Sequence, residues 1–164
     1  MQALIPAAGR GTRLGERTET RPKGLVVIAG RPLLAHVFET AGDAGADELV
    51  VVIGYEGAQI IDRFDDSFAG VPITYVHQRE QLGLGHAVLR AAPHVNGSFL
   101  LLNGDNVFAG SVAPAVAAAD QEGTDGVLAV EEVSNAEAMT TGVLELDDGR
   151  VTGLVEKPDD PPST

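Results

Sequence analysis

Short apolar runs alternate with amphipathic segments over the first three quarters of the sequence. Strands are predicted where the apolar runs are rich in β-branched residues, and helices where apolar residues recur every three or four positions. Leu34 and Phe38, for example, lie one turn apart on the same predicted helical face. The first predicted strand ends at 4–6, further strands cover 48–53, 71–76 and 98–102, and helices cover 33–44, 55–64, 83–92 and 112–119. This alternation predicts an α/β fold with a doubly wound, mostly parallel sheet.

The pattern changes after residue 125, where predicted strands follow one another without helices between them. These strands cover 126–130, 142–146 and 151–156, and Asp147-Asp148-Gly149 predicts a hairpin turn between the last two. The sequence therefore has a strand-rich C-terminal part. Because 164 residues are enough to bury a sizeable core, we expect a single domain over 1–164.

A glycine-rich loop follows the first predicted strand and is unusually basic. Gly9 and Gly11 let the backbone turn tightly and bring its N–H groups close to a ligand. Residues 1–31 carry a net charge of +4, whereas residues 32–164 carry −17. A basic island in an acidic chain indicates an anionic ligand, most directly a phosphate held by backbone amides and by Arg and Lys side chains. The alternative is an ordinary turn whose arginines balance the acidic surface.

Two familiar phosphate-binding motifs do not fit this loop. A P-loop ends in Gly-Lys-Ser or Gly-Lys-Thr, and here Gly11 is followed by Thr12 and Arg13. The dinucleotide fingerprint G-x-G-x-x-G needs a glycine at position 14, which is Leu14. A dinucleotide-dependent oxidoreductase is therefore disfavoured.

Polar residues follow two more of the predicted strands. Gln78 comes shortly after 71–76, and Asp105 shortly after 98–102. Because the ligand crevice of an open parallel sheet lies at the carboxyl ends of its strands, we expect these residues to converge with the glycine-rich loop. The Asp105 carboxylate is suited to hold Mg²⁺ between triphosphate oxygens. The alternative is a turn aspartate that accepts local backbone N–H groups.

The chain resembles the sugar-phosphate nucleotidyltransferases, the family that includes glucose-1-phosphate uridylyl- and thymidylyltransferases. The similar segments are Ala7-Ala8-Gly9-Arg10-Gly11-Thr12-Arg13-Leu14, Pro22-Lys23, Gly30-Arg31-Pro32-Leu33, Gln78 with Gly83, Gly104-Asp105-Asn106, Thr141-Gly142-Val143 and Val155-Glu156-Lys157-Pro158. The pattern departs from the family's common one at Ala8, Glu16 and Gly24, and none of these removes a charged catalytic group. The resemblance spans nearly the whole chain and implies the Rossmann-like nucleotidyltransferase fold.

The resemblance implies an enzyme that joins UTP or dTTP to a sugar 1-phosphate, with glucose 1-phosphate as the expected sugar, and releases pyrophosphate. It assigns catalysis to Arg13, Lys23 and Asp105, with Mg²⁺ as the cofactor on Asp105; nucleotide binding to Ala8, Gly9, Gly11, Thr12, Gln78 and Gly83; and sugar-phosphate binding to Gly142, Glu156 and Lys157. Gln78 and Gly83 are expected to pair with the uracil or thymine edge.

The resemblance leaves some questions open. Family members continue beyond the Glu-Lys-Pro motif and supply a second metal-binding aspartate there, so it also implies a domain that is C-terminally incomplete relative to the family. A non-catalytic module of the same fold, which binds nucleotide or regulates, is the alternative to an enzyme. The choice between UTP and dTTP and the presence of a homo-oligomer are not decided.

The amino-acid composition indicates which partners and which cellular environment to expect. The 24 Asp and Glu residues face only 9 Arg and 2 Lys, a balance typical of proteins that work in concentrated salt and unfavourable for binding nucleic acid or an anionic membrane. There is no Cys, which excludes disulfides and thiolate chemistry. The four histidines, His86 among them, lack metal-ligand spacing and are expected to be structural. With no recognisable leader or membrane-length apolar run, we expect a cytoplasmic protein.

Overall fold

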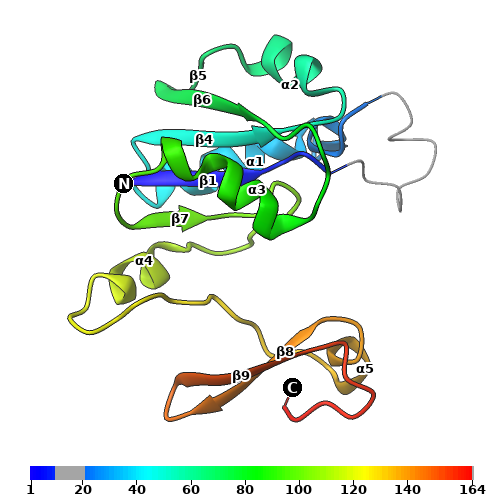
Figure 1. Cartoon of the computed structure of the whole chain (residues 1–164), viewed down its shortest axis with the longest axis vertical. Helices are drawn as coiled ribbons and strands as arrows, with labels where there is room; N and C mark the ends of the chain where they lie inside the picture. Colours follow the sequence, from blue (N-terminus) through cyan, green and yellow to red (C-terminus); the bar gives the residue numbers. More distant parts are fainter. Residues whose placement is uncertain (10–20, 164) are drawn as a thin grey trace. The chain divides into compact units, whose positions relative to one another are not determined.

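The computed structural model describes residues 1–9 and 21–163, which form two compact units, Met1–Val127 and Leu128–Thr164. The expectation of one domain over 1–164 stays a prediction. The elements of the first unit are β1 (Gln2–Pro6), the 3₁₀ turn η2 (Lys23–Leu25), β2 (Val27–Ile28), β3 (Arg31–Pro32), α1 (Leu33–Asp43), β4 (Glu48–Ile53), α2 (Gly57–Phe64), β5 (Ser67–Phe68), β6 (Val71–His77), α3 (Leu84–Ala91), the 3₁₀ turn η3 (Ala92–His94), β7 (Phe99–Leu101) and α4 (Ala113–Ala119) (Figure 1).

A five-stranded sheet in the order β5-β6-β4-β1-β7 forms the centre of this unit. β1 pairs in parallel with β4 on one side and with β7 on the other, and β4 pairs in parallel with β6. Only the two-residue edge strand β5 is antiparallel within this sheet. The chain thus moves outward from β1 through β4 to β6 and returns to place β7 on the opposite side of β1. This reversal makes the carboxyl ends of β1 and β7 a topological switch point, where ligands bind in such sheets.

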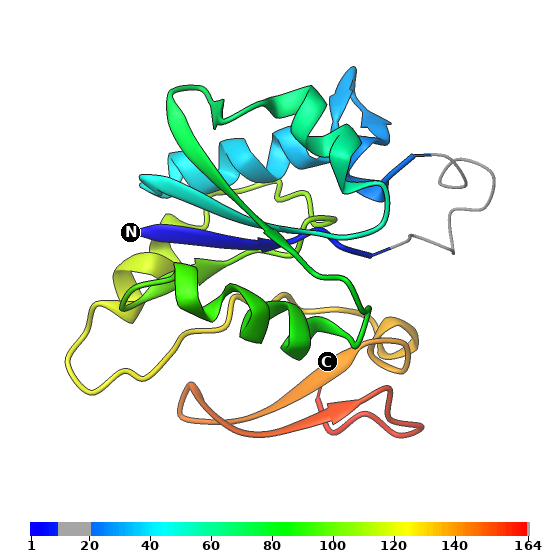
Figure 2. The same ribbon diagram turned by 45° about the horizontal axis from the view of Figure 1, so that its top comes forward.

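Helices cover both faces of the sheet, which confirms the predicted doubly wound, mostly parallel architecture (Figure 2). Successive strand residues point to opposite faces, so the strands supply two apolar layers. Ile5 and Val51 pack with Phe38 of α1 in one layer. Leu4 and Val50 belong to the other, which contains α3. Both faces of the sheet are buried, and residues 49–53 of β4 accordingly form an unbroken apolar run without alternating polar residues.

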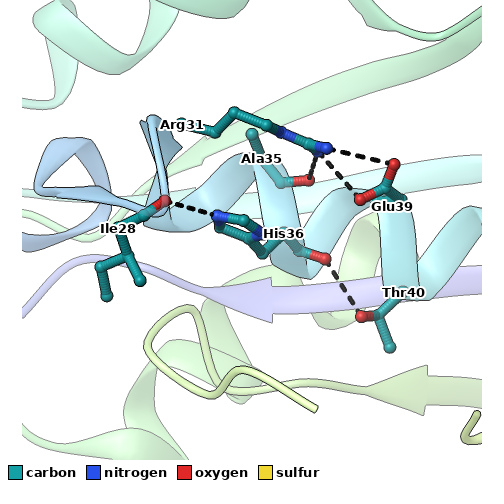
Figure 3. Close-up of polar contacts among 6 residues, drawn as sticks. All are labelled: Ile28, Arg31, Ala35, His36, Glu39 and Thr40. Atoms are coloured by element: carbon teal, nitrogen blue, oxygen red, sulfur yellow. Dashed lines mark hydrogen bonds and ion pairs between the residues drawn. The ribbon is translucent and has the colours of Figure 1, made fainter. Parts of the chain in front are cut away.

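A short hairpin, β2–β3, holds the segment after η2 against helix α1 (Figure 3). The Arg31 guanidinium forms an ion pair with Glu39, at 2.9 Å, and donates to the carbonyl of Ala35. The imidazole Nε2 of His36 lies 2.9 Å from the carbonyl oxygen of Ile28. The sequence did not predict this hairpin, because each of its strands has only two residues and no periodicity. Its attachment to α1 fixes the chain immediately after Lys23.

The second unit contains α5 (Asn135–Ala138), β8 (Gly142–Asp147) and β9 (Arg150–Glu156). The predicted turn is confirmed: Asp148 and Gly149 join β8 to β9, and both have positive φ, as a two-residue hairpin turn of type I′ requires. Ser134 and Glu137 form a capping box at the start of α5, and the hydrogen bonds from Ser134 lower the pKa of the Glu137 carboxyl.

The strand predicted at 126–130 is wrong, because that segment forms no strand. Its apolar residues Leu128 and Val130 are exposed, so the segment has neither a pairing partner nor a buried face. In the part of the chain that the structure describes, no helix has the length and apolar character needed to span a bilayer.

Candidate active site

A cavity of about 470 Å³ opens at the carboxyl ends of β1, β6 and β7. Its lining residues come from the loop after each of these strands, from η2 and from the start of α3. They are Pro6, Ala7, Ala8, Gly9, Lys23, Gly24, Gln78, Gln81, Gly83, Leu84, Ala87, Asn103, Gly104 and Asp105. The predicted convergence of the strand ends with the glycine-rich loop is therefore confirmed for Gly9, Gln78 and Asp105.

Lys23 and Asp105 meet at this cavity. Lys23 Nζ lies 2.5 Å from Asp105 Oδ2, and the two side chains are 33% and 42% exposed. η2 carries the lysine, and the loop after β7 carries the aspartate. The pair brings a cation on a flexible stem and a carboxylate to the switch point, where phosphate groups and a divalent metal are the chemically matching ligands.

Two glycines allow the close approach that places these side chains. Gly104 packs on β1: a Cβ there would lie 2.9 Å from the carbonyl oxygen of Pro6, and its N–H donates to that same oxygen. Gly24 packs on α1, where a Cβ would lie 2.5 Å from Cγ and Cδ1 of the fully buried Leu34. Gly104 precedes Asp105, and Gly24 follows Lys23. Each charged residue is therefore next to a tightly packed position that has no room for a side chain.

Gln78 and the loop that leads into α3 form another part of the cavity lining. Gln78 is 4% exposed, and its amide nitrogen lies 3.3 Å from the carbonyl oxygen of Gly83 and 2.8 Å from Nδ1 of His86. Gly83 has a φ of +91°, a conformation that favours glycine at the start of the helix. Gln81 donates from its amide nitrogen to the carbonyl oxygen of Ala8, which ties this loop to the loop after β1.

Two of these contributions were not predicted from the sequence. His86 was expected to be structural, and the structure adds that it contacts Gln78 at the cavity wall. Gln81 lines the cavity and was not assigned a role. Gln81 could have been predicted, because it lies in the same connection between β6 and α3 as Gln78. The contact made by His86 depends on where α3 begins, which the sequence does not show.

Three predicted phosphate-loop residues, Gly11, Thr12 and Arg13, lie outside the described residues. Their predicted roles therefore stay predictions.

The predicted sugar-phosphate residues lie together in the second unit. Gly142 pairs with Glu156 across β8 and β9, and a Cβ at Gly142 would lie 3.2 Å from Glu156 Oε2. Lys157 follows directly and donates its backbone N–H to the carbonyl of Thr141. Its Nζ lies 3.5 Å from Glu156 Oε1, and both side chains are more than half exposed. Their assignment to sugar-phosphate binding stays a prediction.

No group of three or more His, Asp and Glu side chains suited to hold a metal occurs in 1–9 and 21–163. Among the residues that the structure describes, Asp105 is the one carboxylate that lines the cavity. A single carboxylate fits a Mg²⁺ ion that takes most of its other ligands from substrate phosphates and water, and does not fit an ion held by protein alone.

A family model and several curated proteins match nearly the whole chain. The family model described as Nucleotidyl transferase matches residues 2–164. UTP–glucose-1-phosphate uridylyltransferase AglF of Haloferax volcanii is 46% identical over 164 residues, which cover 99% of this chain and 68% of AglF. The bifunctional protein GlmU of Methanococcus maripaludis is 38% identical over 159 residues, which cover 96% of this chain and 36% of GlmU.

A solved structure of similar fold also covers nearly the whole chain. A UDP-glucose pyrophosphorylase complexed with UDP-glucose superposes with a TM-score of 0.83 at 29% identity, covering 99% of this chain and 71% of that chain. The chain therefore spans about two thirds of AglF and of this structure, and about one third of GlmU.

Proposed function

Because the chain belongs to the nucleotidyl transferase family, we propose that it transfers a uridylyl or thymidylyl group from UTP or dTTP to a sugar 1-phosphate and releases pyrophosphate. Glucose 1-phosphate is the proposed sugar substrate, by analogy with AglF. The observation that carries the proposal is the ion pair of Lys23 and Asp105 in the same cavity as the buried amide of Gln78.

The proposed chemistry needs no general base. A phosphate oxygen of the sugar 1-phosphate attacks the α-phosphorus of the triphosphate, a new P–O bond forms, and the bond to the pyrophosphate breaks. The attacking oxygen is already anionic near neutral pH, so no proton has to be removed from it. Catalysis therefore consists of bringing two anions together and neutralising the charge that develops. This is consistent with the described lining of the cavity, which offers a lysine, a carboxylate and side-chain amides and includes no Ser, Thr, Cys or His.

Each charged residue has a distinct role in this proposal. Lys23 leaves Asp105 and neutralises phosphate charge at the reacting centre, and Arg13 holds the departing pyrophosphate. Asp105 would hold Mg²⁺, which would supply positive charge to offset the negative charge of the triphosphate. The backbone amides around Gly9, Gly11 and Thr12 cradle the phosphates.

The remaining predicted residues determine which base and which sugar phosphate bind. Gln78 and Gly83 pair with the uracil or thymine edge, and Ala8 packs beside the nucleotide. Gly142 and Glu156 contact sugar hydroxyls, and Lys157 binds the sugar phosphate. We also propose a cytoplasmic setting with high salt, since the acidic, lysine-poor composition suits concentrated counterions.

The test is to incubate the protein with Mg²⁺, glucose 1-phosphate and one nucleoside triphosphate at a time, and to measure pyrophosphate release. We expect release with UTP or dTTP that stops when either the sugar phosphate or Mg²⁺ is omitted. Comparing UTP, dUTP and dTTP separates a requirement for the ribose 2′-hydroxyl from a preference for the base. Tight nucleotide binding without pyrophosphate release under any of these conditions would instead support a non-catalytic module.

A further inference from the structure

The sequence contains two Asn-Gly pairs, Asn96-Gly97 and Asn103-Gly104. An asparagine that precedes glycine is especially prone to deamidation, because glycine has no side chain to shield its backbone nitrogen. That nitrogen attacks Cγ of the asparagine, ammonia leaves with the proton of the attacking N–H, and a succinimide ring forms. Water then opens the ring at one of its two carbonyls and gives aspartate or isoaspartate. The reaction needs no enzyme, so its rate depends on whether the glycine nitrogen can reach Cγ.

The pair at the cavity is held in a way that opposes this attack. The N–H of Gly104 donates to the carbonyl oxygen of Pro6 at 3.1 Å. Gly104 is buried, and a Cβ there would lie 2.9 Å from the same oxygen, so the peptide has little room to turn. The carbonyl of Asn103 accepts from the N–H of Asn106 at 3.1 Å, which restrains the other side of the pair. Ring closure therefore requires the Gly104 N–H to give up a buried acceptor.

The other pair lacks these restraints. Asn96 and Gly97 lie in the connection between η3 and β7, and both are exposed. In 1–9 and 21–163, no acceptor is found for the N–H of Gly97. A Cβ at Gly97 would meet no atom within 4 Å, so neighbouring atoms do not obstruct this residue. Its nitrogen can turn toward Cγ of Asn96 without the loss of a hydrogen bond.

We infer that Asn96 is a site of spontaneous deamidation in the folded protein and that the fold protects Asn103. Asn96 precedes β7, whereas Asn103 follows it and lines the cavity. Deamidation of Asn103 would add a carboxylate two positions from Asp105, where phosphate groups are proposed to bind. The backbone N–H of Asn96 instead donates to Oε1 of the buried Gln2, at 2.7 Å. The reactive pair therefore lies beside the start of β1, and the protected pair lies at the carboxyl ends of the strands.

The test compares the two sites in one chain, with and without the fold. The protein is kept in mildly alkaline buffer, either folded or unfolded in concentrated urea, and samples are cleaved with chymotrypsin. This protease cuts after Phe and Leu, so its sites at 99–102 separate the two asparagines. Mass spectrometry then measures the conversion of amide to acid at each site. We expect similar rates in urea, because glycine follows both, and a rate at Asn96 about tenfold or more above that at Asn103 in the folded protein, the effect of about one hydrogen bond.

Two results would overturn the inference. One is a rate at Asn103 that equals or exceeds the rate at Asn96 in the folded protein. The other is an Asn96 that stays intact in the folded protein over the time in which it deamidates in urea. None of these results depends on nucleotidyl transfer.

Gly97→Ala in urea checks the mechanism, because folding has no part in that measurement. The added methyl shields the attacking nitrogen, so deamidation at Asn96 should slow while Asn103 reacts as in wild type. An unchanged rate at Asn96 would show direct hydrolysis of its side chain and overturn the route through residue 97. Asn106 and Asn135 precede valine and alanine, and in urea both should react more slowly than Asn96.

Discussion

Lys23 Nζ lies 2.5 Å from Asp105 Oδ2, although 82 positions separate the two residues in the chain. Both side chains are at least a third exposed, and ion pairs of this kind contribute only about 0–1 kcal/mol to stability. The pair is therefore easily separated. In the proposed reaction, phosphate oxygens would replace Asp105 as the partners of Lys23, and Mg²⁺ would replace Lys23 as the partner of Asp105.

Replacing Lys23 by alanine should separate catalysis from stability. Loss of one preorganised charge-stabilising group is expected to lower turnover by about 10²–10³-fold. The free energy of unfolding should change by no more than about 1 kcal/mol, because the pair is exposed. Pyrophosphate release and urea unfolding measure the two effects. Arg90→Ala on α3 removes an exposed cation outside the cavity and should leave turnover unchanged. Turnover in Lys23→Ala equal to that of wild type would refute the role of this lysine.

Arg13→Ala should also lower turnover by about 10²–10³-fold, since the same kind of group is lost from the departing pyrophosphate. The defect should appear mainly in kcat, because charge builds up on pyrophosphate as its bond breaks. Steady-state kinetics in the forward direction measure it. A variant with normal kcat would exclude Arg13 from the reacting centre.

Asp105→Asn should change the metal requirement. Asparagine has nearly the same volume as aspartate but no charge, so it is a weaker ligand for Mg²⁺. We expect turnover about 10²-fold lower at saturating UTP and a higher Mg²⁺ concentration at half-maximal rate. Titrating Mg²⁺ in the pyrophosphate assay tests both. Asp62→Asn on the exposed face of α2 is the matched control. An unchanged Mg²⁺ titration would show that Asp105 does not bind the metal.

The sequence predicted the part of the site that depends on strand ends. Apolar runs located β1, β4, β6 and β7, and because parallel strands end at one edge of a sheet, these runs also predicted that Gln78 and Asp105 lie near each other. The fold class followed from the same runs. These predictions succeeded because they depend only on where each strand runs and ends, and the apolar runs in the sequence indicate both.

Features that depend on partners and side-chain packing were not predictable. The apolar segment 126–130 has strand-like composition but no neighbouring strand to pair with. The hairpin β2–β3 is too short to show a period, and its position depends on Arg31 and His36 reaching α1. The contact between His86 and Gln78 depends on the direction in which α3 leaves the sheet, which no local pattern records.

Tyr75 should make stability sensitive to alkaline pH. Partial burial, together with the charges of Asp65 and Asp66, raises the pKa of Tyr75 to about 12, against about 10 for an unfolded tyrosine. The folded state therefore keeps this proton longer than the unfolded state does. The stability associated with it is fully present below about pH 10 and is lost as pH rises toward 12. Urea unfolding at about pH 9 and about pH 11.5 should show this loss in wild type.

Tyr75→Phe is the control for that measurement. The variant lacks the hydroxyl that donates to the carbonyl of Asp65 at 2.8 Å, and it should be about 1 kcal/mol less stable at the lower pH. It should also lose less stability than wild type between the two pH values. Parallel pH profiles for both proteins would mean that another group causes the alkaline loss.

Gly24→Ala should disturb the site without touching a charged group. The added methyl would meet Cγ and Cδ1 of Leu34 at 2.5 Å, and Leu34 is fully buried and cannot turn aside. Overpacking of this kind costs about 1–3 kcal/mol in unfolding free energy. Relief of the clash requires η2 to move away from α1 and Lys23 to move with it, so turnover should fall in the fraction that remains folded. Gly42→Ala in α1 is the matched control, because a Cβ there meets no atom within 4 Å and alanine favours helix. If Gly24→Ala lost stability but turned over substrate at the wild-type rate, the position of Lys23 would not depend on the packing of η2 against α1.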